Sequence, residues 1–370
     1  MSRPDPSQRH GPHLVLVTGA GRSDTSSLAG SLARLGFHVP QPDVEAGPTS
    51  AHRSHESRWV SEFHQKLLSR AFIHDLDSRP RARALADELQ ASGDVTADLA
   101  GWLRHQLDEP RIVVNDPQAY WFAASWVSVA QELGVNLSFL TSIRHPVEVV
   151  TSSDLAREQG GPEADRRAQE TAMVAGWVHA AFLTEKDSRH SPRAFMRHTD
   201  LVEDWRSALG RAGDQLELTF DDDLTPGQSH PNDELIDASP GPAVTWENVP
   251  APTALRDLAE EVWQLLCSLV EDPYDQGTSD RMDELHAGYD IMFEEAVALT
   301  YAHTRAESAT AVRTTDTKRK NQLKKLRRKL RNKSRQLERA RARQLQPPET
   351  RRGPNAPLAA RLRRRTAGRS

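Results

Sequence analysis

The chain has 370 residues with 48 Lys or Arg and 52 Asp or Glu, so its formal net charge is −4. Its single cysteine, Cys267, excludes an internal disulfide and a zinc cluster built from cysteines. No stretch approaches the ~18 consecutive apolar residues that a membrane-spanning helix needs. Residues 1–12 lack the apolar core of a secretory signal, so we expect a short disordered leader and a cytoplasmic protein.

The charge is distributed unevenly along the chain. Residues 313–370 contain 22 Lys or Arg and three acidic residues, whereas the other 312 residues contain 26 basic and 49 acidic residues. An acidic body joined to a basic tail predicts two parts with different electrostatic partners.

The strongest local pattern is a strand, a glycine-rich turn and a helix near the N-terminus. Residues 13–19, HLVLVTG, form an apolar run that is typical of a buried parallel strand. After the turn, Leu28, Leu32 and Leu35 recur at helical spacing, and Gly36 ends the helix.

Later segments alternate between strand and helix patterns. Because strands alternate with helices, we predict an α/β fold with a mostly parallel central sheet flanked by helices. The tail pattern has Leu323, Leu326, Leu330 and Leu337 at weak heptad spacing. The predicted strands are 111–116, 136–144 and 192–198. The predicted helices are 57–72, 95–108, 120–133, 163–186, 199–213, 252–270 and 278–308. We also predict an irregular loop or lid at 221–250, a basic helix or short coiled coil at 309–345, and a disordered tail at 346–370.

The turn at 19–26 has the chemistry of an anion-binding site. A turn from a strand into a helix directs backbone N–H groups at one point, and the helix N-terminus adds about half a positive charge there. The alternative is an ordinary strand–helix turn of a Rossmann-like sheet. The residues that are small, cationic or able to donate hydrogen bonds are Gly19, Gly21, Arg22, Ser23, Thr25 and Ser26.

This turn differs from the nucleoside-triphosphatase pattern G-x-x-x-x-G-K-[ST]. Gly19 and Ser26 match its ends, but Asp24 stands at the second glycine and Thr25 at the lysine. Without that lysine, a kinase that transfers phosphate from a magnesium–triphosphate is the least favoured interpretation.

Two motifs resemble those of sulfotransferases. VLVTGAGRSDTSSLAGSLARLG resembles their first phosphosulfate-binding motif, and SIRHPVEVVTSS resembles their 3′-phosphate motif, with Arg144 and Ser152 eight residues apart. RHTDLVEDW, at 197–205, is a weaker match. By these motifs, residues 13–305 are similar to bacterial sulfotransferase-family proteins of the kind often found in actinobacteria.

The resemblance implies a P-loop NTPase-like sulfotransferase fold and a sulfuryl donor, 3′-phosphoadenosine-5′-phosphosulfate (PAPS), used without a metal. It also implies a hydroxyl acceptor on a sugar, glycolipid or cell-surface glycan. Three residues are candidates for the catalytic base: Glu56, His64 and Asp116. Their structural alternatives are a charge in the first turn of a helix, a half-buried packing residue, and an Asx turn before Pro117.

Several positions weaken the match to the family. Asp24 replaces the usual glycine, and Asn115 and Gln118 stand where relatives commonly have Lys and Arg. Arg144 has the alternative role of an ion-pair partner for Glu148. Since all three replacements reduce positive charge, the alternative function is a weakly active or inactive protein of this fold that binds nucleotides or serves as a scaffold.

The basic tail has several possible partners. Its charge fits anionic lipid headgroups, nucleic acid bound without sequence specificity, another helix, or the acidic body of the same chain. It has no aromatic residue to stack on bases. We therefore expect peripheral contact with a membrane or a helical partner, and no specific nucleic acid.

Overall fold

The computed structural model describes residues 11–44, 55–152, 163–236 and 244–344. The predicted leader lies outside these residues except for Gly11 and Pro12, and the predicted tail at 346–370 lies wholly outside them. Among the described residues, no helix is long and apolar enough to cross a membrane.

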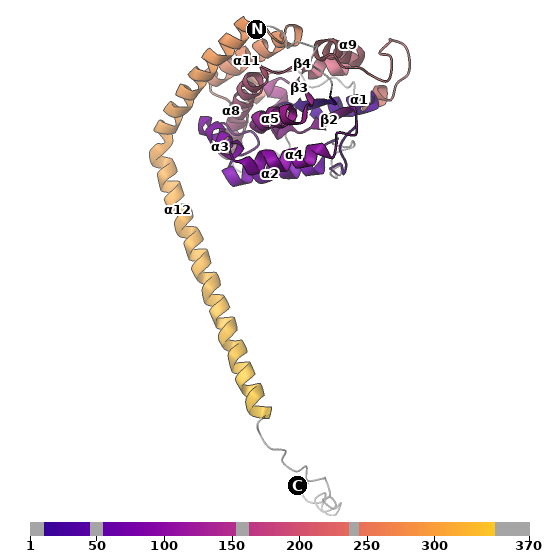
Figure 1. Cartoon of the computed structure of the whole chain (residues 1–370). Coiled ribbons are helices and arrows are strands. Elements are labelled where there is room, and N and C mark those ends of the chain that lie inside the picture. The colour runs from indigo at the N-terminus through magenta and orange to yellow at the C-terminus, as the bar shows by residue number, and fades with distance from the viewer. Residues whose placement is uncertain (1–10, 45–54, 153–162, 237–243, 345–370) are drawn as a thin grey trace, which may run out of the picture. The chain divides into compact units, whose positions relative to one another are not determined.

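A parallel sheet organises the described part of the chain. Its strand order is β2-β1-β3-β4, and both neighbours of β1 run parallel to it (Figure 1). Each strand falls where the apolar pattern predicts it. The strands are β1 (His13–Thr18), β2 (Arg111–Asn115), β3 (Asn136–Ile143) and β4 (Arg193–Arg197).

The central strand β1 is buried on both faces, which explains its unbroken run of apolar residues. Leu14 and Leu16 pack in one hydrophobic cluster, while Val15 and Val17 pack in another on the opposite face. Alternate side chains of a strand point to opposite faces, so an apolar run with no polar alternation needs helices on both sides.

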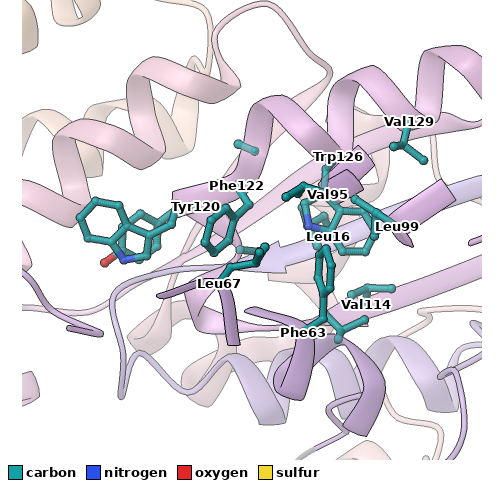
Figure 2. Packing of buried hydrophobic residues seen from close by; sticks show 14 of the residues in the cluster. Leu16, Phe63, Leu67, Val95, Leu99, Val114, Tyr120, Phe122, Trp126 and Val129 are labelled. Carbon is teal, nitrogen blue, oxygen red and sulfur yellow. The ribbon is translucent and has the colours of Figure 1, made fainter. Parts of the chain in front are cut away.

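Helices cover both faces of the sheet. The first cluster is rich in aromatic rings, among them Phe63, Phe122 and Trp126 (Figure 2). It packs under α2 (Arg58–Ala71), α3 (Pro80–Gln90), α4 (Gly93–Arg104), η2 (Pro117–Phe122) and α5 (Ala123–Leu133).

The opposite face is covered by α1 (Thr25–Arg34) and α9 (His198–Leu216). A third cluster lies around the end of β3 and includes α6 (Pro146–Thr151), α8 (Glu163–Ser188) and α11 (Thr253–Glu271). The fold is therefore α/β, with an all-parallel sheet between helices, as predicted.

Three segments differ from the sequence-based expectations. Helix α3 was not predicted, because only Ala82 and Ala86 of its side chains are buried and its apolar pattern is weak. Residues 221–250 contain α10 (Asn232–Leu235) and η3 (Trp246–Asn248), and 237–243 lie outside the described residues. The helices predicted at 278–308 and 309–345 are joined in one continuous helix, α12 (Gln276–Gln344).

The chain divides into two compact units, residues 1–296 and 297–370. The first part of α12 belongs to the first unit, where Met282 and Tyr289 are buried in the third cluster. In the second unit, residues 313–338 form a helix whose side chains are all exposed.

The strand order determines where a ligand is expected to bind. From β1 the chain moves to β2 on one side, and then returns past β1 to β3 and β4 on the other. Ligands of open α/β sheets bind at the carboxyl ends of the strands beside such a reversal. The turn after β1 and Arg144 after β3 both lie at this edge.

Candidate functional site

The turn after β1 has a backbone that only certain residues tolerate. A Cβ on Gly19 would lie 2.4 Å from the carbonyl oxygen of Ser142, so this position requires glycine. Arg22 and Asp24 have φ angles of 67° and 60°, in the left-handed region. Left-handed residues alternating with ordinary ones turn backbone N–H groups towards one side, a geometry that binds anions.

The carboxylate of Asp24 does not occupy the helix N-terminus. One oxygen accepts a 2.7 Å hydrogen bond from Ser27 Oγ, and the other lies 3.3 Å from His198 Nε2. Asp24 makes no side-chain cap on α1. The first-turn N–H groups, which include those of Thr25 and Ser26, have no acceptor within the helix, so they remain available to an anion.

The two arginines predicted to bind anions lie together. Arg144 Nη1 donates to the carbonyl oxygen of Arg22 at 3.3 Å, and Arg22 Nη1 donates to the carbonyl oxygen of Ser152 at 3.2 Å. Arg144 Nε also donates to Glu148 at 3.0 Å, so the predicted alternative pairing is present as well. The hydroxyl of Ser152 donates to the carbonyl oxygen of Val149 at 3.0 Å.

A buried hydroxyl lies beneath the turn. Ser23 is 1% exposed, and its Oγ has no hydrogen-bond partner among the described residues. Ser23 and Thr141 line a cavity of about 20 Å³ between the turn and β3. The uncapped end of α1 and this buried hydroxyl are hydrogen-bond donors at the turn, and such donors suit an anion.

A larger cavity adjoins Arg144. It has a volume of about 310 Å³ and lies at the carboxyl ends of β3 and β4. Arg144 and His198 line it, together with Trp246, Trp263 and Glu260. Apolar rings beside a few polar groups are the usual lining of a small-molecule site.

Acidic side chains gather on the other side of the turn. Burial, followed by the negative charge of Asp116, raises the pKa of Glu56 to about 7. The same two causes raise the pKa of Asp75 to about 6. A Cβ on Gly21 would lie 3.2 Å from Asp75 Oδ2, so this carboxyl group packs against the turn.

His64 and Asp116 form a buried pair. His64 Nδ1 lies 3.0 Å from Asp116 Oδ2, and Trp126 Nε1 donates to His64 Nε2 at 3.2 Å. Because Nε2 accepts the hydrogen bond from Trp126, Nδ1 carries the ring hydrogen and donates a hydrogen bond to Asp116. The other oxygen of Asp116 accepts the N–H of Gln118 at 2.7 Å, which is the Asx turn named as its alternative.

The neutral residues at 115 and 118 both lie beside the acidic cluster's strand end, and Gln118 bonds to one of its members. Asn115 is fully buried at the end of β2, and the side-chain amide of Gln118 donates a hydrogen bond to Asp75 that lowers its pKa. Asp75 and His198 were absent from the predicted site. Asp75 belongs to no motif, and His198 lies in the weakly matching segment 197–205 without being singled out there.

Comparisons with known proteins give a likeness in fold. No protein-family model matches the sequence, and no curated protein sequence matches it significantly. The chain is similar to the sulfotransferase domain from the Synechococcus PCC 7002 olefin synthase, with 17% identity, a TM-score of 0.40, and coverage of 72% of this chain and 98% of that one. The chain is also similar to the sulfotransferase domain from the curacin biosynthetic pathway, with 16% identity, a TM-score of 0.39, and coverage of 69% of this chain and 98% of that one.

Proposed function

We propose that this chain is a sulfotransferase that transfers a sulfuryl group from PAPS to a hydroxyl of a sugar, a glycolipid or a cell-surface glycan. The observation that supports this most directly is the contact between Arg144 and Arg22 beside the uncapped end of α1. Two guanidinium groups and a helix N-terminus within one site suit a nucleotide with two separate anionic ends.

Each group in the turn has a role in this proposal. The N–H groups of Thr25 and Ser26, with Ser23 Oγ and Arg22, bind the phosphosulfate end. Arg144 and Ser152 bind the 3′-phosphate, and the cavity of about 310 Å³ beside Arg144 holds the nucleoside. Donors held in place before the reaction stabilise the charge that develops on the leaving oxygen.

Glu56 is the proposed general base. In the reaction, PAPS supplies the sulfuryl group to the acceptor oxygen, and adenosine 3′,5′-bisphosphate (PAP) leaves. Glu56 takes the proton of the acceptor hydroxyl, and its pKa of about 7 matches that task near neutral pH. Both ring nitrogens of His64 are engaged, and so are both oxygens of Asp116, so we assign these two residues a positioning role.

A second candidate function is nucleotide binding without transfer. The Arg144–Glu148 ion pair favours it, because a bound phosphate must compete with the carboxylate of Glu148. Asp75 against Gly21 adds negative charge near the site whenever it is ionised.

Calorimetry with PAP tests the binding site. Arg144→Ala should weaken PAP binding about 10- to 100-fold, since a hydrogen bond to a charged group contributes about 1.5–3 kcal/mol. Glu148→Gln should strengthen it about two- to fivefold by releasing Arg144. As a matched control, Arg34→Ala removes one positive charge at the far end of α1 and should change the affinity less than about twofold.

A transfer assay then separates the two functions. The wild-type chain is incubated with PAPS and a panel of glycans, and PAP release is measured. Release that depends on a glycan supports the sulfotransferase. Tight PAP binding with no release on any acceptor supports the second candidate, and absence of PAP binding contradicts both.

A further inference from the structure

The second unit carries a basic helix with an apolar edge. Residues 313–338 of α12 contain twelve Lys or Arg and two acidic residues, Asp316 and Glu338. Every side chain in this stretch is exposed. Its large apolar side chains are the leucines of the predicted heptad, with exposed fractions of 47% for Leu323, 56% for Leu326, 65% for Leu330 and 60% for Leu337.

These leucines share one narrow face of the helix. At 3.6 residues per turn, they fall within an arc of about 60° and extend about 21 Å along the axis. Basic residues border the arc on both sides, with Lys320 and Arg327 on one side and Lys329 and Lys333 on the other. Long basic side chains beside an apolar edge can place their stems on apolar surface while their charges stay in water.

A second copy of the helix is a poor partner for this edge. Pairing two copies would bring together two segments that each carry a net charge of +10. Lys333 would also lie in the apolar seam, and no acidic residue lies at the positions beside it to form interhelical ion pairs.

Nucleic acid would bind the basic residues of this segment but would not bury its leucines. Phosphates bind Lys and Arg, whereas the apolar edge would remain in water. The segment has no aromatic side chain to stack on bases. A membrane surface with anionic lipids would bind both the leucines and the basic residues. Apolar side chains enter the membrane interface, and anionic headgroups attract basic side chains.

We propose that residues 313–338 bind the surface of a membrane that contains anionic lipids. In this arrangement the four leucines enter the interface, and the basic residues beside them contact the headgroups. The proposal is independent of sulfuryl transfer, because it concerns residues outside the candidate site and is tested by binding alone.

Vesicle co-sedimentation of the full chain tests this proposal. Vesicles of phosphatidylcholine alone are compared with vesicles that also contain phosphatidylglycerol. We expect binding to the anionic vesicles only, weakened about tenfold or more when salt is raised from low to several times physiological strength. Changing the four leucines to Gln keeps the charge and the helix propensity, and should weaken binding about tenfold.

A matched pair of variants tests the orientation of the helix. Arg327→Gln with Lys333→Gln removes two charges beside the leucines, while Lys324→Gln with Arg328→Gln removes two charges on the opposite face. We expect the first pair to weaken vesicle binding several-fold more than the second, with the helix content from circular dichroism unchanged for both.

Three results would overturn the proposal. The first is equal binding to neutral and anionic vesicles. The second is unaltered vesicle binding by the four-leucine variant. The third is no vesicle binding at all. In that case, binding to duplex DNA would identify nucleic acid as the partner, and a dimer disrupted by the leucine changes would identify a second copy of the helix.

Discussion

At the scale of single residues, burial changes the acid–base chemistry of the Glu56 carboxyl group. Its pKa is raised to about 7 by burial and by the nearby charge of Asp116. A base accepts a proton only when ionised, so we expect kcat/KM to rise with pH up to about 7 and then level off. Glu56→Gln should lower kcat about 10²- to 10⁴-fold and leave PAP affinity nearly unchanged. Steady-state kinetics and calorimetry measure the two effects.

The stability of the protein provides an independent readout for the same residue. Because the pKa of Glu56 is higher in the folded state than its ordinary value of 4.5, the folded state holds the proton more tightly. The resulting contribution of Glu56 to the free energy of unfolding is fully present below about pH 4.5 and is lost as the pH rises through about 7. When stability is measured by urea unfolding, the Glu56→Gln variant should not show this loss of stability between about pH 4.5 and 7. Identical pH profiles for both proteins would contradict the raised pKa.

Among the candidate site residues, those in motifs could be named from the sequence, whereas the contacts they make could not. Arg22 and Arg144 could be named because each follows a strand at a fixed place in a pattern. His64 was named as a candidate base, yet its engagement with Trp126 and Asp116 depends on three segments that meet only in the folded chain. The sequence shows that a histidine is present and not which atoms surround it.

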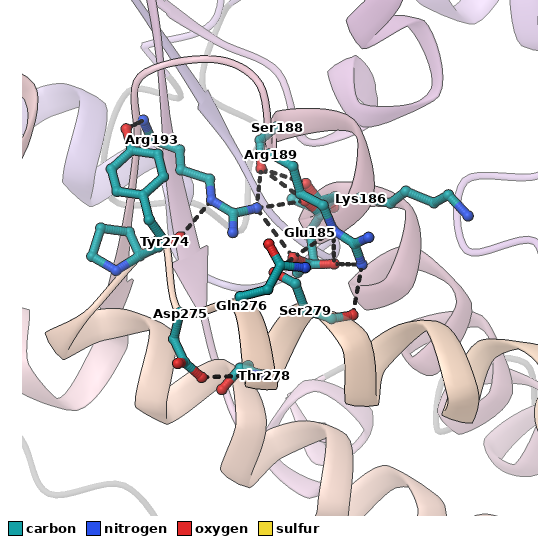
Figure 3. Close-up of polar contacts among 12 residues, drawn as sticks. Glu185, Lys186, Ser188, Arg189, Arg193, Tyr274, Asp275, Gln276, Thr278 and Ser279 are labelled. Carbon is teal, nitrogen blue, oxygen red and sulfur yellow. Dashed lines mark hydrogen bonds and ion pairs between the residues drawn. The ribbon is translucent and has the colours of Figure 1, made fainter. Parts of the chain in front are cut away.

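At the scale of elements, a buried polar network joins α8, β4 and the start of α12 (Figure 3). Arg193 on β4 is 1% exposed and donates to the carboxylate of Glu185 at 3.2 Å and to the carbonyl oxygen of Pro273 at 2.7 Å. Glu185 also accepts from Arg189 and from Ser279 Oγ. The network attaches the start of α12 to the sheet domain, because Ser279 bonds to the buried Glu185, which also pairs with the buried Arg193.

Removing one member of this network should destabilise the fold. Arg193→Met leaves the buried carboxylate of Glu185 with less compensation, at a cost of about 3–5 kcal/mol in the free energy of unfolding. Urea denaturation measures this loss. Arg281→Met, which breaks exposed ion pairs with Glu261 and Glu284, is the control and should have no measurable effect. Equal stabilities for the two variants would contradict the importance of the buried network.

Most elements were predictable from their apolar patterns. The strands and the long amphipathic helices bury one or two continuous faces, and this periodicity is visible in the sequence. Helix α3 escaped prediction because it buries only small alanine side chains. The helices predicted at 278–308 and at 309–345 are one continuous helix, α12, and no glycine or proline between them marks a break.

At the scale of the whole molecule, the buried core lies entirely within the first unit. Every buried hydrophobic residue of the described structure precedes Ala296, the last residue of that unit. Deleting residues 314–370 should therefore leave PAP affinity unchanged within about twofold and the unfolding midpoint unaltered. Calorimetry and thermal unfolding of the truncated chain check both values. A complete loss of PAP binding would show that the tail contributes to the site.

The sequence by itself determined the parallel α/β architecture, the glycine-rich turn after the first strand and the separation of an acidic body from a basic tail. These depend on local periodicity, on residue size and on charge, which are properties of single segments. The tertiary structure decided that Arg22 and Arg144 meet, that Asp24 leaves the end of α1 uncapped, and that Asp75 lies against Gly21. Such contacts join residues from 50 to more than 100 positions apart, and only the packing of the sheet and its helices brings them within bonding distance.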